Sequence, residues 1–123
     1  MKTVLIAEDD KFLSSAYRLK LEKAGLNTLM AEDGQQALDL LQKHRPDLIL
    51  LDLIMPVKDG FQVLEAISQK SSLKDIPVIV ASNLGQKEDI DKSLSFGAKE
   101  FVIKSDLSLD SLVAKIKSLL KLS

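Results

Sequence analysis

Short apolar runs alternate along the whole chain with stretches in which apolar residues recur every three or four positions. The runs predict five β-strands, at residues 3–7, 26–31, 47–51, 76–81 and 100–103. The helical stretches predict five helices, at residues 13–24, 34–44, 61–67, 86–96 and 109–120. Asp59 and Ser108 stand where the caps of the third and fifth helices belong, and Pro46 closes the second.

Strict alternation of strands and helices predicts right-handed crossovers and a parallel sheet. The run from Leu48 to Leu51 lacks the polar alternation of a half-exposed strand, so we expect helices on both faces of the sheet. The fold class is therefore doubly wound α/β, with five parallel strands. In the fourth helix only Ile90 and Leu94 form an apolar stripe, which predicts the most weakly anchored helix of the five.

The chain has 123 residues, with 17 lysines and arginines against 18 acidic residues, a formal net charge of −1. We expect a single domain over residues 1–123, with no output domain, because no linker or repeat interrupts the pattern. No basic excess is present to neutralise nucleic acid or anionic lipid, so neither is expected as a partner. The apolar runs are too short for a membrane span or a signal peptide, which predicts a cytoplasmic protein.

Polar residues follow four of the predicted strands where each strand ends. Glu8 and Asp9 follow the first strand, Asp52 the third, Ser82 the fourth and Lys104 the fifth. In open α/β sheets ligands bind beyond the carboxyl ends of the strands, so we expect these side chains to share one crevice. The neighbouring Asp10 is better explained as a helix cap.

Three carboxylates in one crevice repel one another unless a cation is present. The chain has no cysteine, and its only histidine is His44, which we expect to be solvated at a helix end. A metal ion in this crevice would therefore have oxygen ligands. Mg²⁺ suits such ligands, and Mn²⁺ is possible. Together with Lys104 such an ion balances the charge of Glu8, Asp9 and Asp52, which favours attack by Asp52 on a phosphoryl group.

Four segments carry a resemblance to a known family. The sequence resembles the receiver domain of two-component response regulators, especially the single-domain chemotaxis regulators, in residues 4–10 (VLIAEDD), 46–60 (PDLILLDLIMPVKDG), 77–82 (PVIVAS) and 97–104 (GAKEFVIK). The resemblance implies a flavodoxin-like strand order 2-1-3-4-5 and phosphorylation of Asp52. It also implies Mg²⁺ bound by Asp9, Asp52 and the main-chain carbonyl of Ile54, with Glu8 reaching the ion directly or through water.

The same resemblance assigns further roles. Ser82 matches the hydroxyl residue that bonds the phosphoryl group, Lys104 the family's lysine, and Phe101 its switch aromatic. The implied phosphodonor is a histidine kinase or a histidine phosphotransfer protein. The implied signalling surface is the face formed by the fourth helix, the fifth strand and the fifth helix, which contacts a downstream protein. The protein would catalyse only its own phosphorylation and dephosphorylation, as a monomer or a weak phosphorylation-dependent dimer.

Departures from the family pattern occur at two loops. Ser105 follows Lys104 where the family usually has a proline after a cis peptide bond, and a cis bond before serine costs about 2.5–4 kcal/mol. Asn83 follows Ser82 where a small residue is usual. Ile54 and Leu84 flank the path of an attacking water with apolar side chains, which predicts a long-lived phosphoryl group.

Other classes of protein fit the sequence less well. A haloacid dehalogenase-type phosphatase also uses an aspartate nucleophile and Mg²⁺, but its Asp-x-Asp-x-Thr motif is replaced here by the segment that begins at Glu8. A nucleotide or flavin site needs a glycine-rich loop, and the glycines are at least nine residues apart. A degenerate receiver that only binds partners is the remaining alternative, although all five chemical positions are present.

Overall fold

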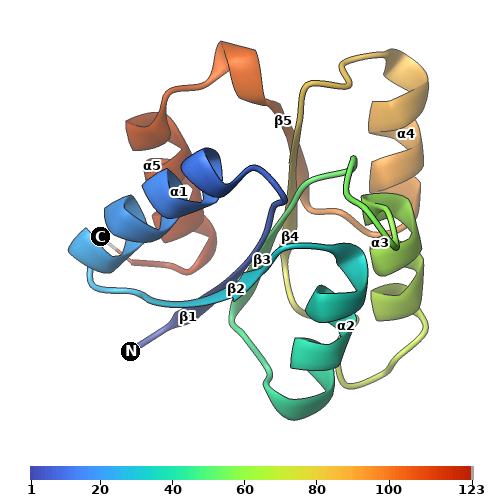
Figure 1. Cartoon of the computed structure of the whole chain (residues 1–123), viewed down its shortest axis with the longest axis horizontal. Coiled ribbons are helices and arrows are strands. Elements are labelled where there is room, and N and C mark those ends of the chain that lie inside the picture. Colours follow the sequence, from blue (N-terminus) through green and yellow to red (C-terminus); the bar gives the residue numbers. More distant parts are fainter. Residues whose placement is uncertain (123) are drawn as a thin grey trace.

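The computed structural model describes residues 1–122 as alternating strands and helices (Figure 1). The strands are β1 (Thr3–Ala7), β2 (Asn27–Ala31), β3 (Leu48–Leu51), β4 (Val78–Ser82) and β5 (Glu100–Ile103). The helices are α1 (Lys11–Lys23), α2 (Gly34–Lys43), α3 (Gly60–Ser68), α4 (Lys87–Ser95) and α5 (Leu109–Leu119), and a short 3₁₀ turn, η1 (Lys104–Asp106), precedes α5. Every predicted element is present, with boundaries displaced by a few residues.

The five strands form one parallel sheet in the order β2-β1-β3-β4-β5, which confirms the predicted fold class and strand order. The register sets the positions of the strand ends. Ala7 is paired with Leu51, and Ser82 with Ile103. The residues that follow these pairs therefore leave the sheet along one edge, which is where the candidate site lies.

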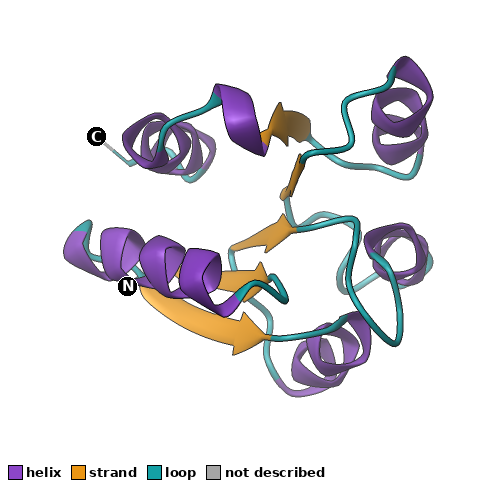
Figure 2. Ribbon diagram, turned by 45° about the horizontal axis from the view of Figure 1, so that its top comes forward, coloured by secondary structure: helices purple, strands orange, loops and turns teal. Residues whose placement is uncertain are grey.

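Helices cover both faces of the sheet, with α1 and α5 on one face and α2, α3 and α4 on the other (Figures 1 and 2). Alternate residues of each central strand enter different clusters: Leu50 packs with α1 and α5, whereas Leu51 packs with the helices of the opposite face. Both residues are buried. This two-sided burial explains why the central strands are apolar at every position.

Side chains cap four of the five helices. Asp10, Asp33, Asp59 and Ser108 each accept a hydrogen bond from a backbone N–H in the first turn of α1, α2, α3 and α5. Such a cap stabilises a helix by about 1 kcal/mol. Gln86 at the start of α4 makes no side-chain cap. The predicted roles of Asp10, Asp59 and Ser108 are confirmed.

The predicted buried stripe of α4 is wrong in one position. Leu94 is 45% exposed and Ile90 is half-buried, whereas Ser93 is fully buried. The Ser93 hydroxyl donates a hydrogen bond to the main-chain oxygen of Asp89, so its polar atom is satisfied within the helix. A small side chain faces the core, and α4 is held by few apolar contacts. Over the described residues 1–122, no helix has the length and apolar character that crossing a membrane requires.

Candidate functional site

Three acidic side chains meet at the carboxyl edge of β1 and β3. Glu8, Asp9 and Asp52 each offer one carboxylate oxygen, and these oxygens all lie within 4.8 Å of one another. Glu8 and Asp52 are buried, whereas Asp9 is exposed. The backbone N–H of Asp52 donates to the carbonyl oxygen of Ala7, at 3.0 Å, so the sheet itself fixes the spacing between the two acidic segments. The structure therefore brings together the acids that the sequence placed at separate strand ends.

Lys104 enters this cluster from the end of β5. Its ammonium donates a hydrogen bond to Glu8 Oε1 and lies 3.2 Å from Asp52 Oδ2. The other carboxylate oxygens accept backbone hydrogen bonds: Glu8 Oε2 from the N–H of Asp10, at 3.2 Å, and Asp52 Oδ1 from the N–H of Ile54, at 3.4 Å. Each buried carboxylate is thus held on both sides.

The buried charges shift the proton affinities of the site. Burial raises the pKa of Glu8 from 4.5 to about 7, and the charge of Asp52 adds to this effect, whereas the hydrogen bond from Lys104 opposes it. Burial pulls the pKa of Lys104 down, but the hydrogen bond to Glu8 and the charge of Asp52 outweigh burial and raise it. Lys104 is therefore a cation at neutral pH, and it faces three acidic side chains.

The donor set of this cluster fits a divalent metal ion. All three side chains offer hard oxygen atoms, two of them buried and one open to solvent. Mg²⁺ and Mn²⁺ prefer such ligands and retain several waters, for which the exposed side of Asp9 leaves room. The excess of negative charge gives a further reason for a cation to bind here. The participation of the Ile54 carbonyl remains a prediction.

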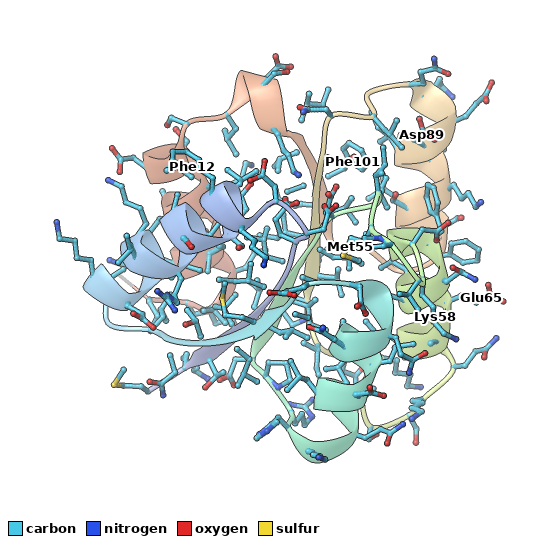
Figure 3. All side chains as sticks on the ribbon, viewed as in Figure 1. Phe12, Met55, Lys58, Glu65, Asp89 and Phe101 are labelled. Carbon is cyan, nitrogen blue, oxygen red and sulfur yellow. The ribbon has the colours of Figure 1, made fainter. Side chains whose placement is uncertain are left out.

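Ser82 and Phe101 stand on β4 and β5, and no hydrogen bond found among residues 1–122 joins Ser82 to one of the three acids. Ser82 is fully buried at the end of β4, and its hydroxyl oxygen accepts a hydrogen bond from the N–H of Leu84, at 3.2 Å. Phe101 is half-buried in β5. Its ring packs against the hydrophobic core cluster that contains Met55 (Figure 3). Ser82 thereby ties the end of β4 to the loop that leads into α4.

The two loops that depart from the family pattern have defined conformations. Lys104 and Ser105 begin the η1 turn, and every peptide bond within the described part of the chain is trans. Asn83 directly follows β4 and is exposed. Ile54 is 59% exposed and Leu84 is half-buried. Both apolar side chains border the same edge of the sheet as Asp52.

Two features of the β3–α3 loop escaped the sequence reasoning. A Cβ atom on Gly60 would lie 2.3 Å from the main-chain oxygen of Asp52, so only glycine lets α3 begin this close to the site. The Asp59-Gly60 pair was the available signal. Val57 adopts a positive φ of 68° and is 73% exposed. Nothing in its residue type indicates that conformation, which β-branched residues rarely adopt.

Comparison with known proteins agrees with this arrangement. A model of the response regulator receiver domain matches residues 4–117. The polar-differentiation response regulator DivK of Brucella anthropi is 33% identical over 119 residues, which are 97% of this chain and 96% of that protein. The chain spans about half the length of other curated relatives that it matches, for example 50% and 52%.

Solved structures of similar proteins share the fold. The receiver domain of the Francisella response regulator 1452 superimposes with a TM-score of 0.90 at 31% identity, and 98% of each chain is covered. The Mn²⁺-bound form of response regulator Rcp1 superimposes with a TM-score of 0.86 at 32% identity, over 96% of this chain and 93% of that one. The similarity therefore extends over almost the whole chain.

Proposed function

The chain belongs to the family of response regulator receiver domains, and on this premise we propose that it is a phosphorylation-dependent signalling switch whose phosphoacceptor is Asp52. The observation that carries the proposal is the environment of that carboxylate. Asp52 is buried at the carboxyl edge of the sheet, with Lys104 3.2 Å from one oxygen and the Ile54 N–H 3.4 Å from the other. A carboxylate oriented on both sides is suited to attack on phosphorus in a fixed direction.

The phosphodonor in this proposal is a phosphohistidine of a histidine kinase or a histidine phosphotransfer protein. An Asp52 oxygen forms the new bond to phosphorus while the bond from phosphorus to the histidine nitrogen breaks, and that nitrogen keeps the electron pair. Lys104 offsets negative charge on the phosphoryl oxygens, and the Ser82 hydroxyl donates to one of them after transfer. Water later attacks phosphorus and releases phosphate. The protein thus catalyses only its own phosphorylation and dephosphorylation.

Asp9, Asp52, Glu8 and the Ile54 carbonyl would hold Mg²⁺ in this site. The ion, when bound, neutralises charge that develops on the transferred group. Support comes from the clustered carboxylate oxygens of the three acids and from the Mn²⁺-bound form of the similar regulator Rcp1. Lys104 alone leaves this acidic cluster with excess negative charge.

An apolar stripe on α1 gives the donor a place to dock. Phe12 is 86% exposed and Leu19 is 62% exposed, and because they are seven residues apart they lie on one face of the helix. Phe12 lies in the first turn of α1, three residues after Asp9 and therefore at the end of the helix nearest the acidic site (Figure 3). A helical donor packed along this stripe would present its phosphohistidine close to Asp52.

The signal leaves the site through α4, β5 and α5. Ser82 contacts the phosphoryl group in this proposal, and its hydroxyl is already bonded to the N–H of Leu84, three residues before α4. Movement of Ser82 would therefore pull on the entry to α4 and let Phe101 become buried. We propose that a downstream protein reads this change, with weak dimerisation as an accompanying response. Phosphorylation would bias an existing two-state equilibrium.

Intact mass spectrometry tests the proposal. The protein is incubated with acetyl phosphate and Mg²⁺, and we expect an increase by the mass of one phosphoryl group. Asp52→Ala and a sample with excess chelator are the controls, and neither should acquire the adduct. An unmodified native protein, or an equal adduct on Asp52→Ala, would refute the assignment.

A further inference from the structure

A cavity of about 140 Å³ lies between α1, β5 and the start of α5, behind the ammonium group that contacts the acidic site. We call it the α1–α5 cavity. Its wall is mostly aliphatic, with side chains from helix, strand and loop. The lining includes Leu13, Tyr17, Val102, Lys104, Leu107 and Leu112.

Three residues with polar side-chain atoms line this cavity, and two of them are already engaged. The Ser108 hydroxyl caps α5 by accepting from the N–H of Ser111, and the Lys104 ammonium is bound to Glu8. Tyr17 is different. It is only 5% exposed, and its hydroxyl takes part in none of the hydrogen bonds found within residues 1–122. No buried side-chain polar atom of residues 1–122 lacks a hydrogen-bond partner, so the unbonded Tyr17 hydroxyl is in contact with solvent. Tyr17 therefore offers the cavity a hydrogen-bond donor that no protein group occupies.

The charges around Tyr17 keep this donor protonated. Burial raises the pKa of the phenol, and the negative charges of Glu8 and Asp52 raise it further. The raised pKa keeps the hydroxyl protonated at neutral pH. It is available to a neutral acceptor.

We propose that the α1–α5 cavity binds one small single-ring aromatic molecule that carries a hydrogen-bond acceptor, with the ring among the aliphatic side chains and the acceptor at the Tyr17 hydroxyl. The size supports this class of ligand, because an engineered cavity of about 150 Å³ lined by apolar side chains binds benzene in another protein. A double-ring compound would exceed the volume. A charged ligand would lose its hydration in an apolar wall without gaining an ion pair, since Lys104 is occupied.

This inference goes beyond phosphorylation and stands without it. Binding requires only the cavity and the Tyr17 hydroxyl, and it does not require a phosphoryl group on Asp52. Lys104 nevertheless lines the cavity and contacts Asp52, so occupancy of the cavity and the state of the acidic site share one side chain. If the proposed function is correct, ligand binding in the cavity and phosphorylation of Asp52 change each other's equilibrium constants.

Titration with phenol and benzene, followed by NMR of the isotope-labelled full chain, tests the proposal. We expect phenol to bind with a dissociation constant on the order of 1 mM or lower, with shifts centred on Leu13, Val102 and Leu112. Phenol should bind about five-fold more tightly than benzene, because it accepts one hydrogen bond that benzene lacks. Tyr17→Phe should remove this preference and leave benzene binding in place.

Two further variants identify the cavity that the probe enters. Leu107→Phe adds bulk at the rim of the α1–α5 cavity and should abolish binding of both probes. Ser68→Leu narrows a separate cavity of about 230 Å³ between α3 and α4, and should leave binding unchanged. Absence of saturable binding would overturn the proposal. So would a phenol preference that survives in Tyr17→Phe, or loss of binding in Ser68→Leu but not in Leu107→Phe.

Discussion

The attachment of α4 to α3 depends on a lysine that lies over aromatic rings. The Lys92 ammonium is 4.2 Å from the centroid of the Phe61 ring in α3 and 6.0 Å from that of Phe96 at the end of α4. The helix otherwise lacks a side-chain cap and buries only Ser93 completely. We therefore expect Lys92 to contribute a large share of what holds α4 in the arrangement seen here.

Replacement of Lys92 by methionine measures this contribution. Methionine keeps a long apolar side chain beside the rings and removes the charge. A cation–π contact at an exposed site contributes about 0.5–1 kcal/mol, which corresponds to a factor of about 2 to 5 in the local opening equilibrium. Hydrogen–deuterium exchange of a peptide that covers α4 should accelerate by this factor, and peptides of α1 should not change.

Lys87→Met is the matched control on the same helix. Lys87 pairs with Asp91 at 2.9 Å on the exposed side of α4, and neither cation–π contact found in residues 1–122 involves it. Its substitution removes the same charge without touching the rings. Equal exchange of α4 in the native protein and in Lys92→Met would refute the reasoning, as would equal acceleration in both variants.

Three further predictions concern the site and its loops. Ile54→Asn replaces the 59% exposed apolar side chain beside Asp52 with an amide that orients water, so the acyl phosphate should decay several-fold faster in a phosphate-release assay, and an unchanged rate would count against a shielding role. Val57→Gly removes the Cβ strain of a φ of 68° and should raise the free energy of unfolding by about 0.5–1 kcal/mol in urea titration, whereas Val57→Ala keeps the Cβ and should gain less. Glu8 has a pKa of about 7 in the fold and an ordinary value of 4.5 in the unfolded chain, so the folded state binds the extra proton and the metal-free protein should become less stable as pH rises between these values. Saturating Mg²⁺ should weaken that slope, and a stability that instead rises over this range would contradict the raised pKa.

The strands and the acidic edge were predictable because their signals are local. The run from Leu48 to Leu51 is apolar throughout since both faces of β3 are buried, and the residue after such a run must leave the sheet at its edge. A parallel sheet then places Glu8, Asp52 and Lys104 along the same edge. Their chemical types completed the prediction of an oxygen-ligand site next to a cation.

Other features depend on packing that periodicity does not encode. The buried face of α4 was assigned to Leu94, but Ser93 takes the core position, and its hydroxyl is bonded to the main-chain oxygen of Asp89. The hydrogen bond from Lys104 to Glu8 depends on two side chains 96 residues apart, and the sequence indicated only that they share a crevice. The close approach of Gly60 to Asp52 is set by the path of one loop. These features emerge from tertiary contacts.

The central claim is that Asp52 carries the phosphoryl group, and chemical location of the acyl phosphate tests it most directly. The protein is phosphorylated with acetyl phosphate and Mg²⁺ and treated with borohydride, which reduces an aspartyl phosphate to homoserine, and its peptides are then sequenced by mass spectrometry. We predict homoserine at position 52 and an unmodified aspartate at position 9. Homoserine at Asp9, or a phosphoryl group found on His44 with Asp52 intact, would contradict the account.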